Sequence, residues 1–167
     1  LHALDYQVYA HLQRAEDDRA EQIMDSLMTD LNYQQTFISA YPLAAIPARY
    51  FIERRQWAEA ASLAEPKPEA FPLARFPWPM SISHFARGLG ASRSGNIEVA
   101  EAAIENLLKL KGEAEDADEA YFAQQVDVNR LAVEAWLALA QGQSDKAVQM
   151  MQLSAELEAS MEKHPVT

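Results

Sequence analysis

The sequence predicts an all-α protein, and three observations support this prediction. Only 5 of the 167 residues are Gly, whereas Ala, Leu, Glu and Gln, which favour helices, are abundant. Apolar residues recur at spacings of three and four along most of the chain, which is typical of amphipathic helices. A short motif recurs at the expected helix-to-helix turns, which indicates repeated helical hairpins. The hydrophobic content of 49% is sufficient for one domain with a core.

Four helical hairpins in a single domain account for most of the chain. They are expected over residues 3–30, 33–64, 81–112 and 118–162. In the first hairpin, Leu4 and Val8 lie one helical turn apart on one face. In the second, Pro42 and Pro47 are expected to kink or split the helix, because Pro removes a backbone donor. The chain starts at Leu1 within an apparent helix, so we expect it to be a fragment of a longer protein.

Residues 65–80 interrupt the helical pattern with five Pro residues. The same segment carries the large apolar residues Phe71, Phe76, Trp78 and Met80. A disordered linker would lack such residues, so we expect an ordered, extended insertion that lies against the helices. One interpretation is a Pro-rich ligand for an aromatic-lined groove. The other is that the aromatic residues simply pack onto the domain.

The charge of the chain is negative and unevenly distributed. Residues 113–167 carry 3 basic and 11 acidic side chains, which gives −8 of the total of −11. This balance argues against nucleic acid as a partner, since phosphates need a basic surface. An acidic surface would attract basic partners, although it also aids solubility. No apolar run approaches the roughly 20 residues of a membrane span, and the compartment, cytoplasmic or periplasmic, is left open.

The acidic run 113–119 has alternating carboxylates, as calcium-binding loops do. It lacks a Gly at the turn position, however, and its ligand order differs from that of such loops. A solvated loop that caps the helix expected from residue 118 is the better interpretation. The chain has no Cys, which excludes disulfides and thiolate metal sites.

The sequence predicts no catalytic residue, no cofactor and no metal. The four His residues are His2, His11, His84 and His164. No pair of them has the spacing of a zinc hydrolase, and we expect His84 to open a helix and His164 to follow one. No Gly-rich phosphate loop or activated Ser is apparent. Gly88 and Gly90 are expected inside a helix, where they allow close packing.

A recurring turn motif gives the clearest evidence for repeated hairpins. Each expected turn has small or polar residues and is followed by an Ala early in the next helix. These Ala residues are Ala20, Ala60, Ala100 and Ala147. The steps between them are 40, 40 and 47 residues, and a period of a few tens of residues is typical of helical solenoids.

This pattern resembles the tetratricopeptide repeat (TPR), a helical hairpin with a small residue in its first helix, Gly at the turn and Ala early in its second helix. Gly88, Gly95 and Ala100 match the motif best. The partial matches are Gly142 with Ala147 and Trp57 with Ala60. The steps exceed the 34 residues of the motif, and Ala15 stands where the first hairpin would have Gly. The resemblance implies a right-handed superhelix of hairpins.

Four short runs are also similar to the C-terminal part of longer bacterial TPR-like proteins whose function is uncharacterised. These runs are residues 2–6, 46–50, 76–79 and 84–90. This similarity concerns the fold and implies no reaction.

In TPR-like superhelices the first helix of each hairpin lines a concave face, and this implies a set of binding residues. The candidates are Tyr9, Arg49, Glu53, Phe85, Leu89, Ser92, Arg93, Asn129 and Trp136. Aromatic residues and Arg at such positions suit a peptide, because these residue types dominate binding energy at interfaces. The alternative is that Tyr9, Phe85 and Trp136 pack between hairpins and meet no ligand.

Taken together, these features predict a non-catalytic scaffold that binds a protein or peptide on its concave face. The alternative is a structural C-terminal segment of a larger solenoid that has no ligand of its own. Such a segment would self-associate as a homo-oligomer, because the apolar end faces of solenoids need capping.

Overall fold

The computed structural model describes residues 1–29, 32–65 and 70–162. Within these residues the chain forms eight α-helices and one short 3-10 helix, and it has no β-strand. The prediction of an all-α protein is therefore confirmed. The helices are α1 (His2–Gln13), α2 (Asp17–Thr29), α3 (Phe37–Glu53), α4 (Trp57–Ala61), η1 (Leu73–Arg75), α5 (Pro77–Ser94), α6 (Ile97–Asp116), α7 (Ala120–Ala140) and α8 (Ser144–Ser160).

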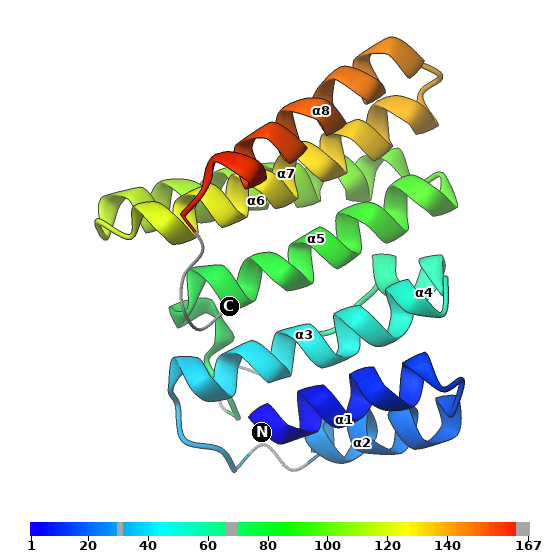
Figure 1. Ribbon diagram of the computed structural model, residues 1–167, viewed down its shortest axis with the longest axis vertical. Helices are drawn as coiled ribbons and strands as arrows, with labels where there is room; N and C mark the ends of the chain where they lie inside the picture. The colour runs from blue at the N-terminus through cyan, green and yellow to red at the C-terminus, as the bar shows by residue number, and fades with distance from the viewer. Residues whose placement is uncertain (30–31, 66–69, 163–167) are drawn as a thin grey trace.

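The helices form four successive hairpins that are stacked along the long axis of the molecule (Figure 1). The odd-numbered helices α1, α3, α5 and α7 contact one another in this order, and we call this set the odd-helix layer. Helices α2, α4 and α6 each pack between two odd-numbered helices, while α8 packs against α7. In Figure 1 the four odd-numbered helices all run from left to right. Their N-terminal ends therefore share one side of the molecule.

Five tight turns between consecutive helices have the same backbone geometry. One residue in each turn has a positive φ, between 55° and 81°. These residues are Ala15, Arg55, Gly95, Asp118 and Gly142. The next residue donates its N–H to the carbonyl oxygen five residues earlier, as Glu16 does to His11 at 2.9 Å and Asn96 to Ala91 at 2.8 Å. This is the Schellman arrangement, and it forms here with Gly at two of the five positions.

The Ala residues that the sequence places after the turns are all buried. Their exposed fractions are 0% for Ala20, Ala60 and Ala100 and 7% for Ala147. A larger side chain at these positions would push the second helix of each hairpin away from its neighbours. The Ala spacing in the sequence therefore marks helix packing.

The close packing expected at Gly88 and Gly90 is confirmed. A Cβ atom on Gly90 would lie 2.6 Å from the carbonyl oxygen of Trp57 and 2.6 Å from the backbone nitrogen of Ala61. A Cβ atom on Gly88 would lie 2.5 Å from Cγ1 of Val133. Helix α5 thus touches the backbone of α4 on one side and a side chain of α7 on the other, and only Gly fits at both contacts.

The extended insertion expected over residues 65–80 is only partly observed. Phe71 is fully buried in the core formed with α1, α2 and α3, and its ring stacks on that of Phe76 at 5.9 Å. These two rings pack onto the domain, as the simpler interpretation has it. The expectation is wrong at the C-terminal end, where α5 begins at Pro77 rather than at residue 81. Pro suits the first position of a helix, because the N–H it lacks would have no helical partner there. Residues 66–69 lie outside the described part.

Three further expectations are corrected by the structure. Helix α6 continues to Asp116, so most of the acidic run 113–119 is helical instead of a loop. Of the two outcomes expected for Pro42 and Pro47, a split helix is excluded, since both residues are buried inside the continuous helix α3. His84 lies in the middle of α5 and does not open a helix. The position of His164 is outside the described residues.

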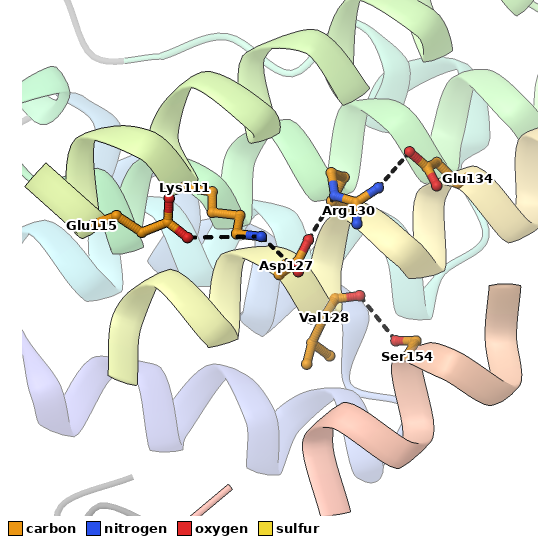
Figure 2. A network of polar contacts seen from close by, with 7 residues as sticks. All are labelled: Lys111, Glu115, Asp127, Val128, Arg130, Glu134 and Ser154. Carbon is orange, nitrogen blue, oxygen red and sulfur yellow. Dashed lines mark hydrogen bonds and ion pairs between the residues drawn. The ribbon is translucent and has the colours of Figure 1, made fainter. Parts of the chain in front are cut away.

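A polar network joins α6, α7 and α8 (Figure 2). Lys111 lies 3.0 Å from Asp127, and Arg130 donates to Asp127 at 2.6 Å and to Glu134 at 2.5 Å. Burial opposes the charge on Asp127, but hydrogen bonds from Lys111 and Arg130 outweigh it and keep the pKa of this carboxyl below its usual value. Ser154 on α8 donates to a backbone carbonyl of α7 at 2.9 Å. The network fixes α7 between its neighbours.

Candidate functional site

A cleft of about 720 Å³ opens on the side where the odd-numbered helices begin. Its volume is within the range of ligand-binding pockets. We call it the aromatic cleft, and its lining residues are His2, Asp5, Tyr6, Phe37, Ile38, Tyr41, Arg49, Trp78, Tyr121, Phe122, Gln125, Glu158 and Met161. All four helices of the odd-helix layer contribute to it, together with the end of α8.

Six aromatic side chains line this cleft, and Phe122 connects three of the helices. Its ring centroid lies 5.5 Å from that of Phe37 on α3 and 6.4 Å from that of Trp78 on α5. Phe37 is 41% exposed and the neighbouring Ile38 is 71% exposed, while Tyr6 on α1 is 64% exposed. Large apolar side chains that remain exposed around one cleft are typical of interaction sites.

The polar side of the cleft is built around an ion pair between α1 and α3. Asp5 is only 7% exposed, and its carboxylate accepts a hydrogen bond from Arg49. The guanidinium of Arg49 also lies 5.8 Å from the ring of Tyr9, within reach of a cation–π interaction. Burial raises the pKa of Tyr41, and the negative charge of Asp5 raises it further. The Tyr41 hydroxyl therefore stays protonated and can donate a hydrogen bond.

Among the nine residues predicted to bind a ligand, Arg49 lines the aromatic cleft. Tyr9 stacks against Arg49 beside the cleft. Glu53 accepts a hydrogen bond from Gln13 at 3.0 Å, which joins α3 to α1 one helical turn further along. These three residues lie together between α1 and α3.

Three of the predicted residues on α5 are part of the interior. Leu89 is 7% exposed, and Ser92 is 5% exposed and donates its hydroxyl to the carbonyl oxygen of Gly88 at 2.8 Å. Phe85 is half-buried against the core between α6 and α7. Helix α5 is in the middle of the layer, so neighbours on both sides cover these positions. Leu89 and Ser92 are thus covered by neighbouring helices, and the half-buried Phe85 packs against the core beside α6 and α7.

Arg93 and Trp136 form a separate arrangement at the opposite ends of the odd-numbered helices. The guanidinium of Arg93 lies 4.8 Å from the ring centroid of Trp136 and 5.1 Å from that of Trp57. We call this the Trp–Arg–Trp stack. Asn129 is half-buried on α7 and is not among the residues that line the cleft. The sequence prediction therefore identified two sites of contact between helices and reached the cleft only at Arg49.

Five of the cleft residues that the sequence analysis missed share one position. Phe37, Ile38, Trp78, Tyr121 and Phe122 all lie in the first turn of their helix. The signal that could have found them is the presence of large apolar residues in the first turns of α3, α5 and α7. The prediction instead took residues from the middle and the end of each helix.

His84 is buried on α5 and is not among the residues that line the cleft. Burial, together with a smaller effect of the nearby Arg87, lowers the pKa of His84 to about 4, while Glu65 opposes this shift. Arg87 donates to the carbonyl oxygen of Leu63 at 2.6 and 2.8 Å and to Glu65 at 2.5 Å, so its charge holds the end of α4 against α5. His84 is therefore neutral at pH 7 and contributes to packing.

No group of three or more potential metal ligands occurs within residues 1–29, 32–65 and 70–162. In the same part of the chain, each helix is too short or too polar to cross a membrane. Comparison with known proteins found no matching family model, no similar curated protein and no similar solved structure.

Proposed function

We propose that the chain is a TPR-like helical scaffold that binds a protein or peptide segment in the aromatic cleft. One observation carries the proposal: six aromatic side chains from all four odd-numbered helices gather around a cleft that is open to solvent. In TPR-like superhelices these helices would be the first of each hairpin and would line the concave face. The proposed binding face is still the one formed by the odd-numbered helices. The binding site, however, lies at the N-terminal ends of these helices and not in their middle.

The binding energy comes mainly from burial of apolar side chains between the rings. Aromatic residues at the centre of an interface commonly contribute about 2 kcal/mol or more each. Tyr41 adds a directional contact on the polar side of the cleft, where a backbone carbonyl of the bound segment can accept a hydrogen bond from the Tyr41 hydroxyl. Arg49 is already paired with Asp5, so its role is to keep Asp5 satisfied and Tyr41 oriented.

A selection from a random peptide library displayed on phage tests this proposal. We expect the immobilised protein to recover peptides whose binding is lost in a Phe37→Ala/Tyr121→Ala variant. Both side chains are partly exposed, so the variant should remain folded, which circular dichroism checks. The matched control is Trp136→Ala, outside the cleft, which should retain binding. Recovery of no peptide, or of peptides that bind the cleft variant equally well, contradicts the proposal.

A second candidate function is self-association, and exposed residues on the last hairpin favour it. Val148 is 57%, Met151 38% and Leu153 42% exposed on α8, and Leu139 on α7 is 46% exposed. Such a surface suits a second copy of the chain or a further hairpin of a larger assembly. Sedimentation velocity over a range of concentrations tests this candidate. Dimers that a Val148→Glu/Met151→Glu variant abolishes would support it, while a constant monomer mass would exclude it.

A further inference from the structure

We propose that the polar side of the aromatic cleft recognises an uncharged amide of the bound segment through Asp5 and Tyr41. In this arrangement the Asp5 carboxylate accepts a hydrogen bond from an N–H group, and the Tyr41 hydroxyl donates one to a neighbouring carbonyl group. Arg49 is a positioning residue that holds the Asp5 carboxylate. This inference rests on the proposed function and names the chemical group that the cleft selects on its partner.

Helices α1 and α3 bring these three side chains together. Tyr41 and Arg49 are eight residues apart on α3, so they lie on the same face of the helix, two turns from each other. The residue between them on this face, Ala45, is small and 4% exposed. Helix α1 packs against α3 (Figure 1), and Asp5 is in the first turn of α1. Arg49 donates to the Asp5 carboxylate, and the negative charge of Asp5 contributes to the raised pKa of Tyr41, so Asp5 is close to both.

The Asp5 carboxylate has one oxygen atom left for a ligand. Its Oδ1 atom accepts a hydrogen bond from Arg49, which also donates to the backbone carbonyl of Asp5 at 3.4 Å. The Oδ2 atom accepts no hydrogen bond from another residue in the described part of the chain, yet it is not a buried atom. Asp5 as a whole is only 7% exposed and lines the cleft, so a ligand in the cleft can reach this oxygen.

Tyr41 supplies the complementary donor. Its neighbour Arg49 carries only N–H donors, so a contact between them uses the Tyr41 oxygen as acceptor and leaves the hydroxyl hydrogen for a ligand. The guanidinium of Arg49 is itself held between the Asp5 carboxylate and the ring of Tyr9, whose centroid is 5.8 Å away. The acceptor and the donor are therefore fixed before a ligand binds, which lowers the entropy cost of recognition.

The charge on this side of the cleft favours a neutral ligand group. Arg49 is the only Lys or Arg among the described residues that line the cleft, and it offsets the charge of Asp5. A charged ligand group would lose its hydration there without gaining a free counter-ion. A wholly apolar segment would leave Oδ2 of Asp5 and the Tyr41 hydroxyl without hydrogen bonds once it excludes water. An amide avoids both costs, because it offers a donor and an acceptor without net charge.

The test uses a peptide recovered in the phage selection, and fluorescence anisotropy measures its affinity. Tyr41→Phe keeps the ring and removes only the hydroxyl, so we expect about tenfold weaker binding. The matched control is Tyr9→Phe, which removes a hydroxyl from an exposed side chain of α1 that does not line the cleft. This control should bind within about twofold of the parent. Equal losses in the two variants would overturn the role of Tyr41.

Changes in the peptide identify the amide. An Asn or Gln side chain presents its N–H and carbonyl groups together, and an extended main chain presents both groups of one residue on the same side. We therefore replace each Asn or Gln by Ala and, separately, methylate each main-chain nitrogen beside the apolar anchors. One of these changes should weaken binding to the parent about tenfold, but binding to Asp5→Asn less than about threefold, because a neutral acceptor forms the weaker hydrogen bond. Circular dichroism checks that Asp5→Asn is folded, and Tyr41→Phe takes its place in the comparison if it is not.

The outcomes separate this inference from the proposed function. Peptides that bind Tyr41→Phe as tightly as the parent would overturn the inference and leave the proposed function intact. Binding that no change of an amide in the peptide weakens would have the same meaning. A selection that recovers no peptide contradicts the proposed function, and the inference with it.

Discussion

The two ends of the odd-helix layer both gather aromatic side chains, but only one of them is open. At the ends of α5 and α7, Arg93 lies between Trp57 and Trp136, so the chain fills its own aromatic site. At the starts of the same helices, Trp78 and Phe122 border a cleft of about 720 Å³. The comparison shows that one aromatic cluster stacks on an Arg of the chain itself, whereas the other borders a cleft among the described residues.

The largest expected effect on stability comes from a substitution that pushes α4 away from α5. It would disrupt the end of the odd-helix layer that holds the Trp–Arg–Trp stack, which we call the closed end. Gly90→Ala should lower the free energy of unfolding by about 3 kcal/mol, because the new Cβ would lie 2.6 Å from the backbone of α4. Gly112→Ala on α6 is the matched control, since no atom lies within 4 Å of its Cβ position. It should raise stability by up to about 1 kcal/mol. Urea denaturation measures both, and equal stability of the two variants would contradict the packing described for Gly90.

His84 lies in the middle of α5, between the two ends of the odd-helix layer. Acidification should therefore lower the free energy of unfolding of the whole layer. The pKa of His84 is about 4 in the folded protein and 6.5 is its usual value, so between these pH values the unfolded chain binds a proton that the folded chain does not. The stability that neutral His84 provides is therefore complete above pH 6.5 and is lost as the pH falls towards 4. Urea denaturation at several pH values should show a slope that is reduced in His84→Gln. An unchanged slope would show that His84 does not titrate as described.

One substitution at each end of the odd-helix layer distinguishes the aromatic cleft from the Trp–Arg–Trp stack as the binding site. Trp78→Ala should weaken binding of a recovered peptide about 30-fold, which corresponds to about 2 kcal/mol, because it removes part of the cleft wall. Trp136→Ala should change the affinity by less than about twofold. Isothermal titration calorimetry on both variants measures this difference. The opposite result would move the binding site to the Trp–Arg–Trp stack.

The smallest expected effect concerns Arg93 itself. Arg93→Met should lower stability by about 1 kcal/mol, since it replaces two cation–π contacts with apolar packing. Lys146→Met, at an exposed position on α8, removes the same charge and should change stability by less than about 0.5 kcal/mol. A double-mutant cycle between Arg93→Met and Trp136→Ala isolates the contact. A coupling energy of zero would mean that the stack does not stabilise the closed end.

Local steric features of the fold could be predicted from the sequence. The spacing of Ala20, Ala60 and Ala100 identified positions where no larger side chain fits, and these residues are fully buried. Gly88 and Gly90 were correctly expected to allow helices to approach closely. Such steric constraints act between helices that are adjacent in the chain. They therefore appear as small residues at regular spacing in a single sequence.

The candidate site could not be predicted, because it depends on which parts of each helix stay uncovered. Helical periodicity identifies a face, but it does not show that α5 is covered on both sides at Leu89 and Ser92 and open at Trp78. The start of α5 was also hidden by Pro77 and Pro79, which suggested an extended segment. Prolines in the first turn of a helix are compatible with it, and this rule would have recovered Trp78 as a helical residue.

The five turns of common geometry also bear on how fast the chain folds. Each one reverses the chain within a few residues, so most contacts form between helices that are adjacent or next but one in sequence. Chains with such local contacts lose little loop entropy before they gain packing, and they fold in microseconds to milliseconds. The α5 to α8 part, where every connection is a tight turn, should acquire its structure first. The part from α1 to α4 depends on Phe71, which is brought back to its core from beyond α4, and should follow.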